Sequence, residues 1–216
     1  LFAAVASASA LLAAGSANAV YVNNDGLGQA LIYPYYTVRN GNTTLLSVVN
    51  TTDQAKAVKV RFLDGKNTAE VLDFNLFLSP KDVWTGAILA TADGAMIKTT
   101  DKSCTNPIIP TAGQPFRNYQ FVEDARNTVG VPASLLAMDR TREGYVEILE
   151  MATIAADSTF GKDVTHVNGK PKCSMTSDAI ATNTTAGVSA PSGGLFGSES
   201  IVNFASGYST SVDATA

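Results

Sequence analysis

Two stretches of strictly alternating side chains limit most strongly what this chain can fold into. In "AVKVRFLDG" (57–65), Val58, Val60 and Phe62 fall on one face of an extended strand and two cations fall on the other. The stretch "AEVLDFNLFLSP" (69–80) repeats the pattern, with apolar side chains at every second position from Leu72 to Leu78. A period of two marks strands with one face in a core and one face in water. The pattern therefore predicts antiparallel β-structure.

Turn chemistry separates these strands from their neighbours at intervals of about ten residues. Asn40-Gly41 lies between two β-prone runs and predicts a hairpin turn. The polar break at residues 50–54 is expected to connect two strands that share one core, because Asn and Asp side chains bond nearby backbone groups. Strands of this length and spacing, with no helical period of ten residues between positions 20 and 100, favour a sandwich or a barrel over βαβ units.

The second half of the chain is less regular. "REGYVEILEMATI" (142–154) predicts another strand, and "SESIVNFASGYSTSV" (198–212) predicts a last strand and its turn. A proline at the first turn predicts a short helix near residues 132–138. A Ser-, Gly- and Ala-rich stretch near residues 186–198 is typical of a flexible crossing. We expect a mainly β fold with long loops and one or two short helices.

The first nineteen residues, "LFAAVASASALLAAGSANA", are uncharged and end in small residues at a typical cleavage position. This pattern predicts a secretory signal peptide at 1–19 that lacks its basic start, followed by one domain at 20–216. A retained membrane or filament-core helix is the alternative, since nineteen helical residues span about 28 Å. The missing closing signal after residue 212 is consistent with a chain that continues past residue 216.

Two cysteines, Cys104 and Cys173, are the whole cysteine content of the chain. In an oxidising compartment they are expected to pair, and the bridge would close a loop worth about 4 kcal/mol in the chain-entropy model. Two unpaired buried thiols are the alternative. Neither cysteine belongs to a C-x-x-C motif, so the sequence supports neither redox catalysis nor a zinc site.

Charge and composition exclude several classes of protein. The formal net charge is −4 and charged residues make up 16% of the chain, which provides no basic footprint for nucleic acid. A hydrophobic content of 45% does not fit a disordered chain. No segment after the leader is long and apolar enough to span a bilayer. We therefore expect an exported protein located in the periplasm, on the outer surface or outside the cell.

The run "LLSVVNTTDQAKAVKVRFLDG…VLDFNLFLSPKDVWTGAI" (45–88) resembles the strand signature of immunoglobulin-like sandwiches in exported bacterial proteins. The shared features are an apolar strand ending at Asn50, an alternating partner at residues 58–62, and a strand closed by "LSP" at 78–80. Similar patterns occur in pilus-chaperone and adhesion-type domains and in uncharacterised cell-surface or envelope proteins. The resemblance covers about 45 residues. It implies an immunoglobulin-like or jelly-roll-like sandwich and names no activity.

Few residues are candidates for catalysis. His166 is the single histidine, and no G-x-S-x-G motif accompanies it. Glu143 and Glu147 would lie on one strand face about 13 Å apart, which exceeds the roughly 5–9.5 Å between the carboxyl groups of glycoside hydrolases. We therefore expect no catalytic, cofactor-binding or metal-binding residues and no cofactor.

Three aromatic residues are the candidates for a ligand platform. Tyr33 and Tyr35 share one face of a predicted strand, and with Trp84 they could stack on sugar rings. Burial in the core is the alternative fate of these rings.

The sequence as a whole favours a non-catalytic structural or interaction module of the cell envelope or extracellular surface. Its expected partners are other proteins, or further copies of itself, bound through an exposed sheet edge. Residues 20–32 are the candidate edge or exchanged strand. The alternatives are a carbohydrate-binding module or glycoside-cleaving enzyme, for which glycans would be the partners, and a periplasmic chaperone.

Overall fold

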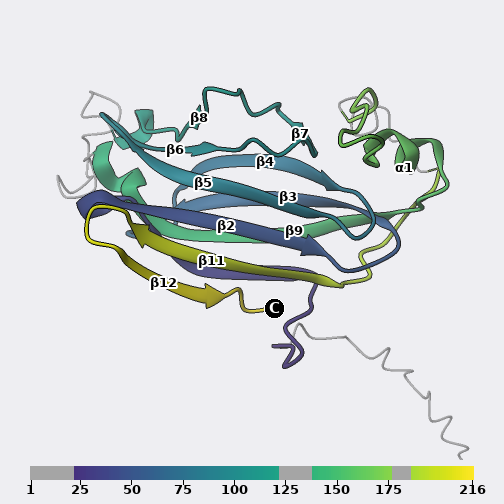
Figure 1. Cartoon of the computed structure of the whole chain (residues 1–216), viewed down its shortest axis with the longest axis horizontal. Helices are drawn as coiled ribbons and strands as arrows, with labels where there is room; N and C mark the ends of the chain where they lie inside the picture. The colour runs from purple at the N-terminus through teal and green to yellow at the C-terminus, as the bar shows by residue number, and fades with distance from the viewer. Residues whose placement is uncertain (1–21, 122–137, 177–185) are drawn as a thin grey trace, which may run out of the picture.

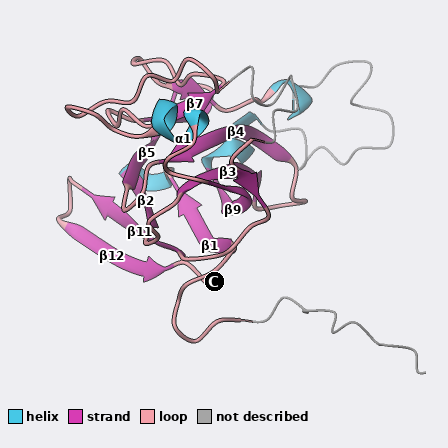
Figure 2. Ribbon diagram, turned by 90° about the vertical axis from the view of Figure 1, so that its right-hand side faces the viewer, coloured by secondary structure: helices cyan, strands magenta, loops and turns pink. Residues whose placement is uncertain are grey.

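The strands form two antiparallel sheets that pack face to face. The computed structural model describes residues 22–121, 138–176 and 186–216. Sheet A has the strand order β12–β11–β2–β5–β6–β8: Tyr208–Asp213, Leu195–Asn203, Asn42–Asn50, Val83–Thr91, Gly94–Lys98 and Gln114–Pro115. Sheet B has the order β1–β9–β3–β4–β7, with β10 beside β9: Ala30–Thr37, Glu143–Ile154, Ala55–Asp64, Glu70–Leu78, Cys104–Asn106 and Val188–Ser189. Figure 1 shows the strands side by side, and Figure 2 shows the two layers from the end.

This architecture confirms the predicted mainly β sandwich and is compatible with an immunoglobulin-like fold. The described helical segments are short: α1 Thr159–Val164 and the 3-10 turns Arg39–Gly41, Tyr119–Phe121 and Met138–Arg142. The predicted helix near residues 132–138 lies outside the described residues except for its last residue. The predicted leader at 1–19 also lies outside them.

The alternating stretches form neighbouring strands, β3 and β4, as their period predicted. Val58, Val60 and Phe62 are fully buried, and Leu72, Phe74, Leu76 and Leu78 are buried opposite them. Phe74 packs against Phe62 and against Trp84 of the facing sheet, with ring centroids 6.3 and 5.9 Å apart. Burial of large aromatic and aliphatic side chains between the sheets is the main contribution to the stability of such a fold.

Two connections had been predicted from turn chemistry. Asn40 and Gly41 do turn the chain, with positive φ of 56° and 77°. The strands on either side belong to different sheets, however, so this turn is an arch across the sandwich rather than the expected hairpin.

The break at residues 50–54 connects β2 of sheet A to β3 of sheet B, as expected. The buried Asn50 amide donates to the carbonyl oxygens of Gln54 and Ser79, both at 2.7 Å. Its own oxygen accepts the backbone N–H of Thr52 at 3.0 Å. One side chain thus replaces the backbone hydrogen bonds that the chain loses where it changes sheets.

A second apolar cluster covers one end of sheet B on its outer side. Phe77 points outward from β4 by alternation, yet it is 1% exposed because α1 packs over it. Its ring lies 5.6 Å from that of Phe160. Cys104 and Cys173 close this region with a disulfide of S–S distance 2.08 Å, which confirms the predicted bridge.

The glycine- and serine-rich crossing ends earlier than expected. Residues 195–198 of the predicted flexible stretch already belong to β11. The predicted last strand at 198–212 is in fact most of a hairpin of two strands, β11 and β12, joined by a turn at residues 204–207.

Candidate functional site

The three aromatic candidates do not form a shared platform. Tyr33 and Trp84 are core residues with 0% and 1% exposure, whereas Tyr35 is 45% exposed. The register of β1 shifts between Tyr33 and Tyr36, so Tyr33 and Tyr35 do not share one face as strict alternation had predicted. The Tyr33 hydroxyl donates to the Ser47 carbonyl at 2.7 Å, and burial raises the pKa of this phenol.

The glutamates of β9 are held by cations. Glu147 accepts from Arg61 at 2.9 Å, and Glu143 lies 3.0 Å from Arg39. On the opposite face, Glu150 is buried against Lys56 at 2.8 Å. Each glutamate therefore has a positively charged partner, and in the described part of the chain we find no convergent carboxyl pair facing a cavity.

His166 lies close to a serine and an aspartate, but not as a catalytic triad. Its Nδ1 is 2.6 Å from the hydroxyl of Ser79 and 3.5 Å from Asp82. In a triad the serine and the aspartate contact different ring nitrogens, whereas here both contact Nδ1. Ser79 is also buried, and its hydroxyl accepts the backbone N–H of His166 at 3.0 Å. The arrangement ties the loop after α1 to the end of β4.

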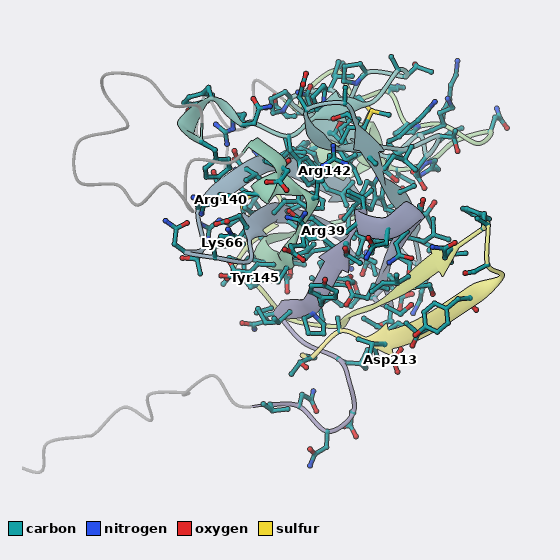
Figure 3. The ribbon with its side chains drawn as sticks, turned by 90° about the vertical axis from the view of Figure 1, so that its left-hand side faces the viewer. Arg39, Lys66, Arg140, Arg142, Tyr145 and Asp213 are labelled. Carbon is teal, nitrogen blue, oxygen red and sulfur yellow. A yellow bond between two sulfur atoms is a disulfide. The ribbon has the colours of Figure 1, made fainter. Side chains whose placement is uncertain are left out.

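Cationic side chains gather at one end of the sandwich. Figure 3 shows Arg39, Lys66, Arg140 and Arg142 there, with Asp213 well apart on β12. The Arg140 guanidinium donates to the buried Asp64 carboxylate at 2.7 Å and lies 4.2 Å from the ring centre of Phe121. Arg142 donates to the carbonyl oxygens of the turn at residues 91–92. These contacts of Arg140 and Arg142 hold neighbouring segments of the chain together, so both side chains have a structural role.

The edge strand of sheet B is blocked along its length. Ile32 of β1 exchanges backbone hydrogen bonds with Thr215 at 2.8 and 2.9 Å, and Pro34 has no N–H to offer. The N–H of Tyr35 donates to the Glu199 carboxylate at 3.2 Å, and the N–H of Thr37 donates to the Thr44 hydroxyl at 3.0 Å. Side chains and the chain end thus occupy groups that could otherwise pair with a foreign strand.

The predicted edge strand at residues 20–32 contributes little to this edge. Within the described part of that range, residues 30–32 belong to β1, and Leu31 is fully buried against β9. Residues 22–29 lie outside the strands, although Gly28 forms an isolated bridge with Leu195.

Strand β12 presents a different kind of edge. It is six residues long, every residue in it is exposed, and it forms the outermost strand of sheet A. Among the described residues, no strand pairs with its far side. Apart from β1, the strands at the ends of the two sheets are shorter: β7 has three residues and β8 has two. Figure 1 shows β12 extending along the lower side of the sandwich, beyond β11.

The backbone groups that β12 turns outward follow from its register. The N–H of Ala214 donates to the carbonyl oxygen of Gly197 at 2.8 Å. Hydrogen-bonded and non-hydrogen-bonded residue pairs alternate along an antiparallel ladder such as that between β11 and β12. The N–H and C=O groups of Val212 and its alternate neighbours therefore point to β11. Those of Ser209 and Ser211 point away from the sheet and are free to pair with another strand.

A shallow hollow also lies on the outer face of sheet A. Its volume is 490 Å³, and its lining combines Leu45, Leu89 and small residues with the hydroxyl groups of Ser47 and Thr85. Among the residues that the structure describes, no aromatic ring lines it, and Lys98 is its one charged side chain. The hollow thus lacks the stacking surface that the carbohydrate-binding alternative required.

Comparison of the chain with protein-family models, curated proteins and solved structures found no match. The likeness to immunoglobulin-like sandwiches therefore rests on the strand pattern and on the two-sheet architecture. In the ranges that the structure describes, no helix has the length and hydropathy needed to cross a membrane. The same ranges contain no group of three or more His, Cys, Asp or Glu side chains placed to hold a metal ion.

The sequence predicted an exposed sheet edge at residues 20–32. The described part of that range reaches the edge strand β1 at residues 30–32, whereas β12 is an outer strand that the sequence did not single out. The signal for β12 was present in "YSTSVD" (208–213), which alternates between larger and smaller side chains after a Gly207 turn. Alternation alone does not tell a central strand from an edge strand, because that difference depends on which strands lie beside it.

Proposed function

We propose that this protein is a non-catalytic structural module of the bacterial cell envelope or extracellular surface. We infer that it associates with further copies of itself through the free edge of β12. The observation that carries the proposal is the contrast between the two long outer strands: β1 is blocked at four successive points, whereas β12 is exposed along all six residues. Strand addition to an exposed edge is a common mode of protein association.

The sequence of β12 fits an antiparallel copy of itself. If Thr210 lies opposite Thr210 of a second copy, then Tyr208 faces Val212 of that copy on the inner face of the joined sheet. These side chains are 57% and 46% exposed in one chain, and an aromatic residue opposite a β-branched one is a favourable cross-strand pair. The same register brings Ser209 opposite Ser211 of the second copy. The backbone N–H and C=O groups of both residues point away from β11, so they can form the hydrogen bonds between the copies.

Charge is compatible with this pairing. Asp213 is the single charged residue of β12. In the antiparallel register the two copies of Asp213 lie at opposite ends of the joined strands, about 20 Å apart at a rise of about 3.4 Å per residue. Charges at that distance are largely screened at physiological ionic strength. Antiparallel pairing thus avoids the like-charge contact that a parallel arrangement would create.

The disulfide supports export. Cys104 and Cys173 form a bridge of ordinary dimensions, with Cα atoms 5.4 Å apart. Such bridges persist in secreted and envelope proteins and are rare in a reducing cytosol.

Solution mass is the direct test. The mass of the chain from residue 20 onward would be measured by sedimentation across a concentration series, and any polymers would be inspected by electron microscopy. The informative variant is Ser209→Pro, which removes a free N–H from the outer side of β12 and leaves the bonds to β11 in place. Ser209→Ala is the matched control, because it removes the hydroxyl and keeps the N–H.

We expect Ser209→Pro to weaken association about thirtyfold, since a symmetric pair loses two hydrogen bonds at about 1 kcal/mol each. Ser209→Ala should associate like the parent chain. A parent chain that stays monomeric throughout the concentration series would overturn the proposal, as would equal association by both variants.

A further inference from the structure

A narrow slot separates β1 from the β11–β12 hairpin. Its volume is 180 Å³. Pro34 and Tyr35 of β1 line one side, and Ile201 and Val212 of the hairpin line the other. Since a water molecule occupies about 30 Å³ of liquid, the slot has room for a chain of about six non-hydrogen atoms.

The lining of this largely apolar slot includes one carboxylate-bearing residue, Glu199. Glu199 of β11 lies opposite Val212 in the register, on the inner face of the hairpin, and is 3% exposed. Its Oε1 accepts the Tyr35 N–H at 3.2 Å. Its Oε2 is buried and has no hydrogen-bond partner among the described residues. A buried carboxylate oxygen without a partner is rare, because desolvation is costly unless a donor or a positive charge compensates it.

No cation within the described residues compensates this carboxylate. Burial raises the pKa of Glu199 to about 7, and the Tyr35 N–H opposes this only in part. From β1 the titratable groups near it are the phenols of Tyr33 and Tyr35, and the pKa of Tyr33 is raised by burial and by the charge of Glu199. From β12 the facing residues are Thr210 and Val212, which carry no charge. The slot therefore combines apolar walls with one unneutralised acid.

We propose that this slot binds a primary alkylammonium group, with the ammonium on Oε2 of Glu199 and the alkyl chain between Pro34, Ile201 and Val212. An ammonium supplies both things that the oxygen lacks, a positive charge and N–H donors. A divalent metal ion does not fit, because calcium and magnesium need several oxygen ligands and the described lining of the slot offers a single carboxylate. A quaternary ammonium does not fit either, because it carries no N–H and favours a cage of several aromatic rings.

The slot belongs to a single copy of the chain, so this binding does not depend on association through β12. Titration calorimetry or NMR shifts with n-butylammonium as the probe would measure the affinity. The uncharged 1-butanol is the matched ligand, since it has the same number of non-hydrogen atoms. Glu199→Gln is the key variant, because the amide oxygen can still accept the Tyr35 N–H while the charge is removed. Glu143→Gln is the matched control, since Glu143 contacts the Tyr35 hydroxyl from outside the slot.

We expect butylammonium to bind at least tenfold more tightly than 1-butanol, and Glu199→Gln to remove that difference while Glu143→Gln keeps it. Affinity should also rise about tenfold from pH 6 to pH 8, since a carboxyl group with a pKa of about 7 goes from about one-tenth to about nine-tenths ionised. Nα-acetyl-lysinamide, tested in parallel, distinguishes a free amine from the lysine side chain of a polypeptide. Equal affinity for the two probes supports the lysine source, and weaker binding of the lysine derivative supports the free amine.

Three outcomes would overturn the inference. The first is the absence of butylammonium binding at 10 mM, and the second is equal binding of butylammonium and 1-butanol. The third is unchanged butylammonium binding in Glu199→Gln. Because this variant removes a buried charge, it is expected to fold, and its thermal unfolding would be recorded to verify that.

Discussion

The ammonium nitrogen of Lys56 lies 2.8 Å from Oε1 of Glu150, and both side chains are completely buried. The lysine also donates to the hydroxyl groups of Thr153 at 3.0 Å and Ser192 at 2.7 Å, which uses all three of its protons. The second oxygen of Glu150 accepts the N–H of Gly193 at 2.8 Å. This ion pair joins β3 and β9 to the crossing that leads into β11.

Loss of one partner of this pair should be costly. Lys56→Met leaves Glu150 buried without a cation, so we expect the free energy of unfolding to fall by about 3–5 kcal/mol. Lys59→Met is the matched control, because Lys59 pairs with Asp73 at 2.8 Å on a half-exposed surface and should lose less than about 1 kcal/mol. Urea unfolding of both variants measures the difference. Equal losses would show that the buried Lys56–Glu150 pair contributes no more to the free energy of unfolding than the partly exposed Lys59–Asp73 pair.

The Cys104–Cys173 bridge should contribute about 4 kcal/mol in the chain-entropy model, because it spans 69 positions of the chain. We expect the double variant Cys104→Ser/Cys173→Ser to lose about that much stability in denaturant unfolding. Treatment of the parent chain with a reductant should lower its stability to the level of the variant, and the variant itself should not respond. A variant as stable as the oxidised parent would contradict this expectation.

Glu199 should make stability depend on pH in a defined direction. Its pKa is raised from 4.5 to about 7 in the folded chain, so folding favours the protonated carboxyl group. The contribution of the protonated Glu199 to the free energy of unfolding is fully present below about pH 4.5 and is lost as the pH rises through 7. After allowance for solvent screening at the mouth of the slot, we expect a loss of about 2 kcal/mol.

Comparison with Glu199→Gln isolates this contribution. Between pH 5 and pH 8, the free energy of unfolding of the parent should fall by about 2 kcal/mol relative to that of the variant. Chemical unfolding at several pH values measures both curves. Parallel curves would show that Glu199 does not titrate across this range in the folded chain.

Gly197 of β11 marks a close approach between the sheets. A Cβ atom at this position would collide with the hydroxyl of Tyr33 and with the carbonyl oxygen of Ser47. We expect Gly197→Ala to lose more than about 2 kcal/mol, because the Tyr33 ring is packed in the core and cannot move freely. Gly65→Ala is the control, since the nearest atom to its Cβ would lie at an ordinary 3.6 Å. Thermal unfolding of the pair would test this, and similar melting temperatures would argue against it.

The sequence predicted best where one physical rule decides the outcome. The burial of Val58, Val60 and Phe62 followed from the period of two, because an extended strand sends alternate side chains to opposite faces. The Cys104–Cys173 bridge followed from there being two cysteines in a chain with a secretory pattern. Each of these predictions used local geometry or simple counting and needed no knowledge of which strands are neighbours.

Predictions failed where distant segments come together. Asn40-Gly41 was predicted as a hairpin, but the preference of a turn for its residues does not say whether the next strand joins the same sheet. Phe77 is outward by alternation and yet buried, because α1, more than 80 residues later, packs over it. Tyr33 and Tyr35 were separated by a register shift against β9 that neither residue encodes alone.

Local sequence patterns were enough to predict the class of the fold, the inward faces of its central strands and its covalent cross-link. The packing of distant strands sets which strand edges are occupied, and both candidate sites depend on those edges. Glu199 lies 164 positions from the Tyr35 N–H that it accepts, and β12 is an open edge because no described strand lies beyond it. Alternation is a property of one strand, whereas an edge or a slot is a relationship between strands that are far apart in the chain.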